Sequence, residues 1–285
     1  MDKIVIIKRM EDLLAFRENQ ERKFEDVIVC TSTMYGTDDA SNMRVKLALQ
    51  FLEKAKELGL KVVIVEGGST NQKFLQEATP IRFPNLTLIK SQTVAMGPKR
   101  RESLKTAMEM FPHALYFLYT EPEKSDLISA PNIKSMVEAL ENGANIVVPE
   151  RRGGLKNYSR LQTWMEYRAN KRVNKLTKPG TEKIDMWFGP KIFDRTAARE
   201  FLDYNKEGDK LDFWDAIHVP VITASKKGGR IVSVPIDFIY PEEQRAMEEG
   251  NEEFDKKRLD QYMKILAEAG DPFWKKQQES KKTKK

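Results

Sequence analysis

Short apolar strand patterns alternate with helical patterns through the first half of the chain. The strand patterns cover residues 26–33, 61–69, 86–91, 114–119 and 145–150. Strands of this kind are rich in apolar residues because helices cover both faces of the sheet. Helical spacing of apolar residues separates them at residues 40–59, 99–111 and 132–144. Since strand–helix–strand units form right-handed crossovers, the sequence predicts an α/β, Rossmann-like fold with a mostly parallel central sheet flanked by helices.

The pattern changes after about residue 151. Long helical patterns occupy residues 157–176 and 242–270. Between them lie an aromatic strand-turn with a helix at 186–205 and a strand within 230–240. We therefore expect residues 1–150 and 151–270 to be two halves of one domain, the second of mixed α/β structure. Residues 271–285 are expected to form a basic, disordered tail.

The formal charge of +6 comes mostly from the end of the chain. The last eleven residues, KKQQESKKTKK, hold six lysines and one glutamate, which leaves a nearly neutral body. A lysine tail of this kind is usually solvated, and it could make weak contacts with anionic surfaces. A neutral body without a basic stripe argues against specific binding of nucleic acid.

Cysteine content and hydropathy indicate a cytoplasmic protein. Cys30 is the single cysteine of the 285 residues, which excludes an intrachain disulfide and suits a reducing compartment. No apolar stretch approaches the roughly 20 residues that a transmembrane helix needs. The apolar run near the N-terminus is too short for a signal peptide.

Polar or glycine residues follow four of the predicted strands. They read TSTMYGTDD, EGGSTN, TEPEK and PERRGG. The carboxyl ends of parallel strands meet at one edge of a sheet, where ligands bind in open α/β folds. The sequence therefore predicts a binding cleft at this edge.

In their order along residues 26–262, these motifs resemble those of nucleotide-sugar glycosyltransferases of the GT-A fold, especially the family-2-like enzymes and the mannosylglycerate and glucosyl-phosphoglycerate synthases. The resemblance implies a nucleoside-diphosphate-sugar donor bound by residues 1–150 and a small or glycan acceptor bound by residues 151–270. The implied donor-binding residues are Thr31, Ser32, Thr33, Glu66, Gly67, Lys99, Arg100 and Thr120. The implied acceptor-binding residues include Trp187 and Gly189 in the segment MWFGP.

The resemblance also places Glu121-Pro122-Glu123 where the family has the Asp-x-Asp motif that holds a divalent metal. Two carboxylates on a strand-end loop can both turn toward one Mg²⁺ or Mn²⁺ ion, which prefers oxygen ligands. His218 corresponds to a late metal ligand of some members. Glutamate in place of aspartate is a departure, because the longer side chain loses more rotamer freedom when it is ordered. A solvated acidic turn is the alternative for the glutamates, and a structural role is the alternative for His218.

The chemistry of transfer agrees with these positions. The diphosphate leaves with added negative charge, so cations must face it, either a metal or basic side chains. Lys99 and Arg100, at the start of a predicted helix, provide such charge next to free backbone N–H groups. The alternative for both is a solvated first helical turn. For Glu66, the alternative to ligand binding is a turn acid that accepts from backbone N–H groups.

Carboxylates and arginines near the acceptor complete the predicted site. In an inverting transferase, Asp215, or Asp212 one helical turn earlier, would accept the proton of the acceptor hydroxyl. Arg151 and Arg152 would suit capture of a carboxylate or phosphate on the acceptor. A helix-terminal acid, a solvated loop and a core aromatic are the alternatives for the aspartates, the arginines and Trp187.

Two other functions compete with sugar transfer. A nucleotidyltransferase would share the sheet and the cleft, but it normally has a glycine-rich basic loop after the first strand, where this chain reads TSTMYGTDDASN. A non-catalytic nucleotide- or sugar-binding protein is the other alternative. An apolar stripe on the helix at 242–270 packs either on the body or against a second copy, so a homodimer is possible.

Overall fold

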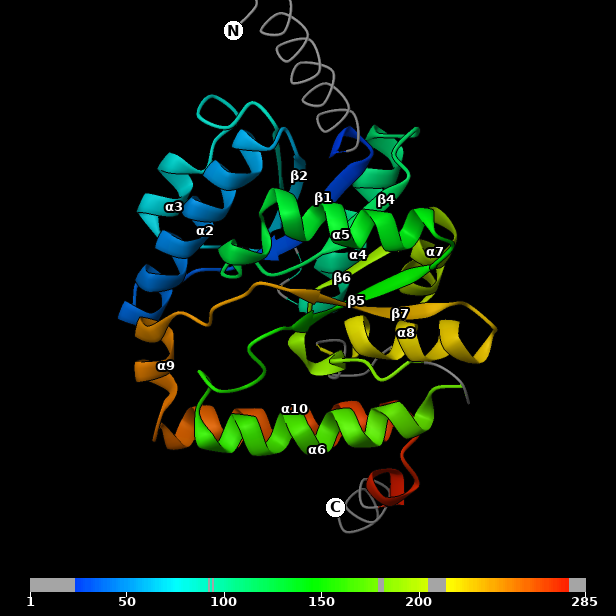
Figure 1. Ribbon diagram of the computed structural model, residues 1–285. Coiled ribbons are helices and arrows are strands. Elements are labelled where there is room, and N and C mark those ends of the chain that lie inside the picture. The colour runs from blue at the N-terminus through cyan, green and yellow to red at the C-terminus, as the bar shows by residue number, and fades with distance from the viewer. Residues whose placement is uncertain (1–23, 92, 94, 179–181, 205–213, 277–285) are drawn as a thin grey trace, which may run out of the picture.

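The computed structural model of the chain describes residues 24–91, 93, 95–178, 182–204 and 214–276. Within these residues, seven strands form one sheet in the order β3-β2-β1-β4-β6-β5-β7 (Figure 1). The strands are β1 (Val27–Thr33), β2 (Lys61–Glu66), β3 (Leu86–Lys90), β4 (Tyr116–Tyr119), β5 (Ile146–Arg151), β6 (Lys191–Asp194) and β7 (Ile231–Ile236).

All the strands except β6 run in the same direction. Strands β3, β2, β1 and β4 pair in parallel, and so do β5 and β7. Strand β6 lies between β4 and β5 and is antiparallel to both, so β4 and β5 share one direction. The carboxyl ends of β1, β2, β4 and β5 therefore lie at one edge of the sheet, as the sequence predicts.

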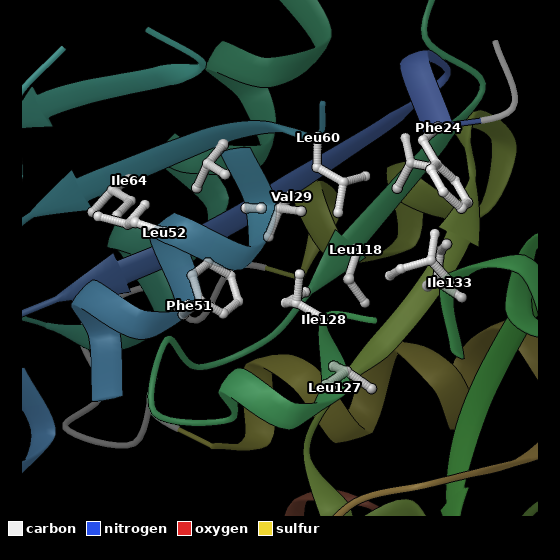
Figure 2. Packing of buried hydrophobic residues seen from close by; sticks show 14 of the residues in the cluster. Phe24, Val29, Phe51, Leu52, Leu60, Ile64, Leu118, Leu127, Ile128 and Ile133 are labelled. Carbon is white, nitrogen blue, oxygen red and sulfur yellow. The ribbon is translucent and has the colours of Figure 1, made fainter. Parts of the chain in front are cut away.

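One face of the sheet is covered by helices α2 (Asp39–Glu57), α3 (Gln72–Glu77) and α5 (Ala130–Glu141), together with the short 3-10 turn η1 (Ser125–Leu127). Figure 2 shows Phe51 and Leu52 of α2 near Val29 and Ile64 of the sheet. Leu118 lies near Ile133 of α5 in the same view. All of these side chains are fully buried, and burying each contributes about 1.5–3 kcal/mol.

The opposite face carries the other long helices. They are α4 (Met96–Met110), α6 (Arg160–Leu176), α7 (Arg195–Asp203), α8 (Asp215–Lys226) and α10 (Glu252–Glu268), together with the 3-10 turn η2 (Met186–Phe188). The short helix α9 (Glu242–Glu248) contacts α2 instead. Helices α6 and α10 lie side by side at the bottom of Figure 1 and contact each other. None of the described helices has the length and hydrophobicity that a membrane-spanning segment needs.

Three sequence predictions need correction. The predicted helix at 242–270 is two helices, because Gly250 adopts a left-handed φ of 74° and the Asn251 side chain caps α10. Helix α4 begins at Met96, three residues before the predicted start, so Lys99 and Arg100 lie at the end of its first turn. The tail begins later than residue 271, since Asp271 is buried and accepts from Arg172 Nη1 at 2.8 Å.

Candidate active site

Two adjoining cavities lie at the edge of the sheet where the parallel strands end. Their volumes are about 430 and 250 Å³. The residues that line both are Arg44, Glu121, Glu123, Trp214, Lys257, Gln261 and Ile265. Ser32, Thr33, Lys99 and Asp215 line the larger cavity, and Arg151, Trp187 and His218 line the smaller one. Helix α10 closes the side opposite the strand ends.

The carboxylate of Glu121 is held by two basic side chains. Arg100 Nη2 donates to its Oε1 at 3.1 Å, and Lys124 Nζ donates to its Oε2 at 2.5 Å. Burial opposes ionisation of Glu121, but the charges of Lys124 and Arg100 outweigh it and lower the pKa of this carboxyl to about 2. Gly189, at φ 101°, lies against the same carboxylate, and a Cβ there would lie 3.2 Å from both of its oxygens. Glu121 is therefore a buried anion at pH 7.

Local sequence explains the position of Lys124. Glu121-Pro122-Glu123-Lys124 forms a turn in which the Lys124 amide donates to the Glu121 carbonyl at 3.0 Å. Proline suits the second position of such a turn, because its φ is fixed near the value required. The turn brings the lysine side chain back onto the carboxylate of Glu121.

Glu123 faces helix α2. Its Oε1 lies 3.4 Å from Nε of Arg44, and the side chain of Glu123 is mostly buried. The charge of Glu123 raises the pKa of Arg44. The two glutamates of the turn thus each have a cationic partner.

Lys99 packs across the end of β2. Its side chain is buried and its Nζ donates to the carbonyl oxygen of Thr33 at 3.4 Å. Burial lowers the pKa of Lys99, and the nearby Glu66 opposes this. Glu66 accepts a hydrogen bond from the Ser69 amide and does not line either cavity. The alternative prediction for Glu66, a turn acid that satisfies a backbone donor, describes this geometry.

Arg100 has unused hydrogen-bonding capacity. Its guanidinium stacks over the ring of Trp214 at 4.8 Å, and only 7% of its side chain is exposed. Its Nη1 atom is buried and has no hydrogen-bond partner among the described residues. Because buried polar groups are nearly always paired in native proteins, an orphan donor beside a cavity indicates a place for a ligand or a water molecule.

Asp215 is the first residue of α8, is buried and lines the larger cavity. Its Oδ2 accepts from the hydroxyl of Tyr204 at 2.7 Å. Asp212, the other predicted catalytic residue, lies outside the described residues. His218 is one turn along α8, and its ring stacks on Trp187 with centroids 5.2 Å apart. Burial lowers the pKa of His218 well below its usual range, so the imidazole is neutral at pH 7.

Arg151 is built into the body of the protein. Its Nη2 donates to Glu166 Oε2 at 2.7 Å, and its Nε and Nη2 donate to Asp185 at 2.6 and 2.7 Å. The side chain is 1% exposed. Arg152, in contrast, is exposed and pairs with Asp237 at 2.9 Å, away from both cavities. The two adjacent arginines, predicted to act together, therefore have separate surroundings.

The predicted metal ligands Glu121, Glu123 and His218 all line the smaller cavity. The described residues contain no group of three or more His, Cys, Asp or Glu side chains arranged to hold a metal ion. Both oxygens of Glu121 hold cationic groups, and Glu123 faces Arg44. A divalent ion would have to displace these cations from the carboxylates. In this arrangement the side chains do not fit the predicted metal.

Some of the other predicted residues line the cavities, and others are buried beside them. Ser32 and Thr33 line the larger cavity, whereas Thr31 is buried behind it. Thr120 is buried, and its hydroxyl contacts the Glu121 carbonyl at 3.3 Å. Several further side chains line the cavities and were not predicted from the sequence, namely Arg44, Lys124, Trp214, Lys257 and Gln261. Of these, only Lys124 could have been predicted from the local sequence, because it is the last residue of the turn Glu121-Pro122-Glu123-Lys124.

No protein-family model and no curated protein sequence matches the chain. Solved structures do resemble it. The mannosyl-3-phosphoglycerate synthase of Rubrobacter xylanophilus superposes with a TM-score of 0.55 and 9% identity, over 91% of this chain and 78% of that one. The glucosyl-3-phosphoglycerate synthase of M. tuberculosis gives 0.51 and 10%, over 89% and 85%. Its complex with phosphoglyceric acid gives 0.50 and 12%, over 90% and 83%. At such identities the similarity is one of fold, and it confirms the predicted α/β architecture of the GT-A type.

Proposed function

We propose that this protein is a transferase that moves a sugar from a nucleoside-diphosphate-sugar donor to a hydroxyl group of an acceptor. The observation that carries the proposal is the gathering of cations at the strand-end edge of two adjoining cavities, Lys99 and Arg100 in the larger and Lys124 in the smaller. Positive charge in a partly enclosed site stabilises a departing diphosphate far better than the same charge in water. A fold shared with a glucosyl-3-phosphoglycerate synthase and a mannosyl-3-phosphoglycerate synthase supports the same assignment by analogy.

The larger cavity suits the donor nucleotide. Its volume of about 430 Å³ lies within the range of small-molecule sites. Hydroxyls of Ser32 and Thr33 lie at one end, and Lys99 and Arg100 lie where a diphosphate would follow. Burial lowers the pKa of Lys99 in the free protein. A bound anion would act in the opposite direction, because it favours the charged form of the lysine.

The smaller cavity suits the acceptor. Trp187 offers a ring that is held in place by stacking on His218, and Gly189 keeps the chain close to Glu121. Asp215 lines the larger cavity, next to Trp214, which lines both, and it is the carboxylate that would accept the proton of the acceptor hydroxyl in an inverting transfer. The hydrogen bond from Tyr204 would orient this carboxylate.

The lone buried Cys30, which has no disulfide, fits the predicted cytoplasmic location.

Nucleotidyl transfer has less support. Helix α2 begins after β1, where a triphosphate would meet a phosphate-binding loop. Here Asp38 caps the helix, with its carboxylate accepting from the Ser41 amide at 2.9 Å. An acid at this place would repel a phosphate chain, because both carry negative charge.

Thermal stability with a panel of nucleotides tests the proposed function. The nucleoside mono-, di- and triphosphates of adenine, guanine, cytosine and uracil would each be added at about 100 times the dissociation constant. A bound diphosphate then stabilises the fold by about 2.7 kcal/mol, which raises Tm by roughly 4–5 °C for a chain of this size. Response to triphosphates alone would favour nucleotidyl transfer. No response to any nucleotide would refute the proposed function.

Catalysis is tested separately with Asp215→Asn. The diphosphate that stabilises the wild type should stabilise this variant at least as well, because the substitution removes a negative charge from the larger cavity and so does not weaken the binding of an anion. Turnover of the matching nucleotide-sugar, measured as released diphosphate, should fall at least about 100-fold, since general-base catalysis contributes that much or more. A wild type that binds donor without turning it over would favour the non-catalytic alternative.

A further inference from the structure

The cleft contains more cations than its two turn glutamates need. Lys99 and Arg100 line the larger cavity, Lys124 lines the smaller one, and Arg44 lines both. Arg100 and Lys124 share the single carboxylate of Glu121, which also lines both cavities. A lysine has three donors and an arginine five, so one hydrogen bond to a carboxylate leaves most donors available. Arg100 shows this directly, because its Nη1 is buried without a partner in the described part of the chain.

Glu121 holds these cations in place. Its two oxygens each accept from a different side chain, Arg100 from α4 and Lys124 from the turn after β4. The guanidinium is fixed further by Trp214, and the ammonium of Lys124 lies 5.6 Å from the ring of Phe188. Side chains fixed in advance in this way stabilise developing charge without reorganisation during the reaction.

The charges are sufficient for a diphosphate. Arg100 and Lys124 together carry the charge of one divalent ion, and Glu121 compensates half of it. Lys99 and Arg44 add two positive charges, of which Glu123 compensates one. These four cations and two glutamates together carry a net charge of +2. The other charged residues that line the larger cavity balance one another: Lys257 and Lys264 against Asp215 and Asp260.

On the basis of the proposed function, we propose that Arg100 and Lys124, positioned by Glu121, supply the positive charge at the leaving diphosphate in place of a divalent metal. Glu121 is then a positioning residue rather than a metal ligand. Lys124 is the more accessible of the two cations, with 17% of its side chain exposed against 7% for Arg100. Arg100 lines the larger cavity and Lys124 the smaller one, so a diphosphate that contacts both cations lies where the cavities meet, beside Glu121, which lines both.

Calorimetric titration of UDP, GDP, ADP and CDP tests this without requiring turnover. Each titration is run on the full chain after exhaustive treatment with EDTA, and again with about 5-fold excess Mg²⁺ or Mn²⁺ over nucleotide. We expect at least one diphosphate to bind with dissociation constants that agree within about threefold across the three conditions.

Variants identify the cations responsible. Lys124→Ala should weaken diphosphate binding in EDTA by roughly 10–100-fold, the value of a hydrogen bond to a charged group. Lys124→Arg should stay within a few-fold of the wild type, because it retains the charge. The matched control is Lys54→Ala, which removes a lysine that pairs with Asp126 outside both cavities. If Lys124→Ala does not fold, Lys124→Gln replaces it with the same control, because its side-chain amide can still donate to Glu121 but carries no charge.

The outcomes separate this inference from the proposed function. Binding that appears only with Mg²⁺ or Mn²⁺ overturns the inference and leaves the proposed transferase intact. Binding in EDTA that is unchanged by Lys124→Ala also overturns it. No binding in any condition refutes the proposed function, and the inference with it.

Discussion

The ammonium of Lys99 occupies the space that a side chain at Gly67 would need. A Cβ built on Gly67 would collide with Lys99 Nζ and would lie 2.6 Å from its Cδ. Glycine at the end of β2 thus lets the lysine cross the backbone and reach the Thr33 carbonyl. The position of Lys99 therefore depends on a glycine at the end of β2.

Gly67→Ala should therefore act on ligand binding rather than on the fold. The clash falls on the flexible end of a lysine, which can move away, so we expect Tm to change by no more than a few degrees. Displaced Lys99 should weaken binding of the diphosphate found in the nucleotide panel by about tenfold, the same as Lys99→Ala. Gly153→Ala is the control, because no described atom lies within 4 Å of its added Cβ. Unchanged affinity in both Gly67→Ala and Lys99→Ala would exclude Lys99 from the donor site.

Arg151→Ala should destabilise the protein strongly. It would leave the carboxylates of Glu166 and Asp185 without their buried cation, and breaking one side of a buried ion pair costs about 3–5 kcal/mol. Arg152→Ala, at an exposed pair with Asp237, should cost less than about 1 kcal/mol. Urea unfolding of both variants provides the comparison. Equal effects would contradict the separate environments of the two arginines.

Lys191 gives a prediction about alkaline pH. Its Nζ is fully buried and donates to the carbonyl oxygens of Met186, Gly189 and Pro190 at 2.9–3.2 Å. Burial lowers the pKa of Lys191 to about 7 from 10.5. Between these two pH values the unfolded chain binds more protons than the folded one. The contribution of Lys191 to the free energy of unfolding therefore increases as pH rises from about 7 to about 10.5.

The comparison is with Lys191→Met, which lacks the titrating group. From pH 7 to pH 9.5, the unfolding free energy of the wild type should rise by roughly 3 kcal/mol relative to the variant. Chemical unfolding at the two pH values measures the difference. A constant difference would show that Lys191 keeps an ordinary pKa.

Glu121 gives a dependence of the same sign at acid pH, since the folded-state pKa of this carboxyl is also lowered. Its carboxyl has a pKa of about 2 in the folded protein, below the reference value of 4.5. Stability from this group is present above the unfolded pKa and is lost as pH falls toward the folded value. Relative to Glu121→Gln, the wild type should lose roughly 1.5 kcal/mol of unfolding free energy between pH 6 and pH 3.5. Parallel pH profiles of the two proteins would mean that the two cations do not hold this carboxylate.

Sequence patterns predicted the parallel part of the sheet because its strands are buried on both faces. Val27–Thr33 and Lys61–Glu66 carry short, almost unbroken apolar runs rich in β-branched residues, which are typical of covered strands. Strand β6 was less accessible to such reasoning. It is four residues long and begins at Lys191, a residue type that is rarely buried. Its place between β4 and β5 depends on long-range pairing that no local pattern encodes.

The candidate site divides in the same way. Residues at strand ends, such as Thr33 and Glu121, could be predicted because strand direction brings them to one edge. Arg44 could not, because it lies within α2, 79 positions before its partner Glu123. The cationic partners also changed the interpretation of the two glutamates. A carboxylate pair in sequence looks like a metal motif until the side chains that neutralise it are known.

The position of β6 has a practical consequence for dissecting this protein. Because a strand from the second half is inserted between β4 and β5 of the first, a fragment ending at residue 150 would expose the backbone edge of β4 and leave β5 with no neighbour on either side within the described sheet. Unpaired edges of this kind invite aggregation. Donor and acceptor binding therefore have to be separated by point substitution, since cutting the chain between the halves would divide the sheet itself.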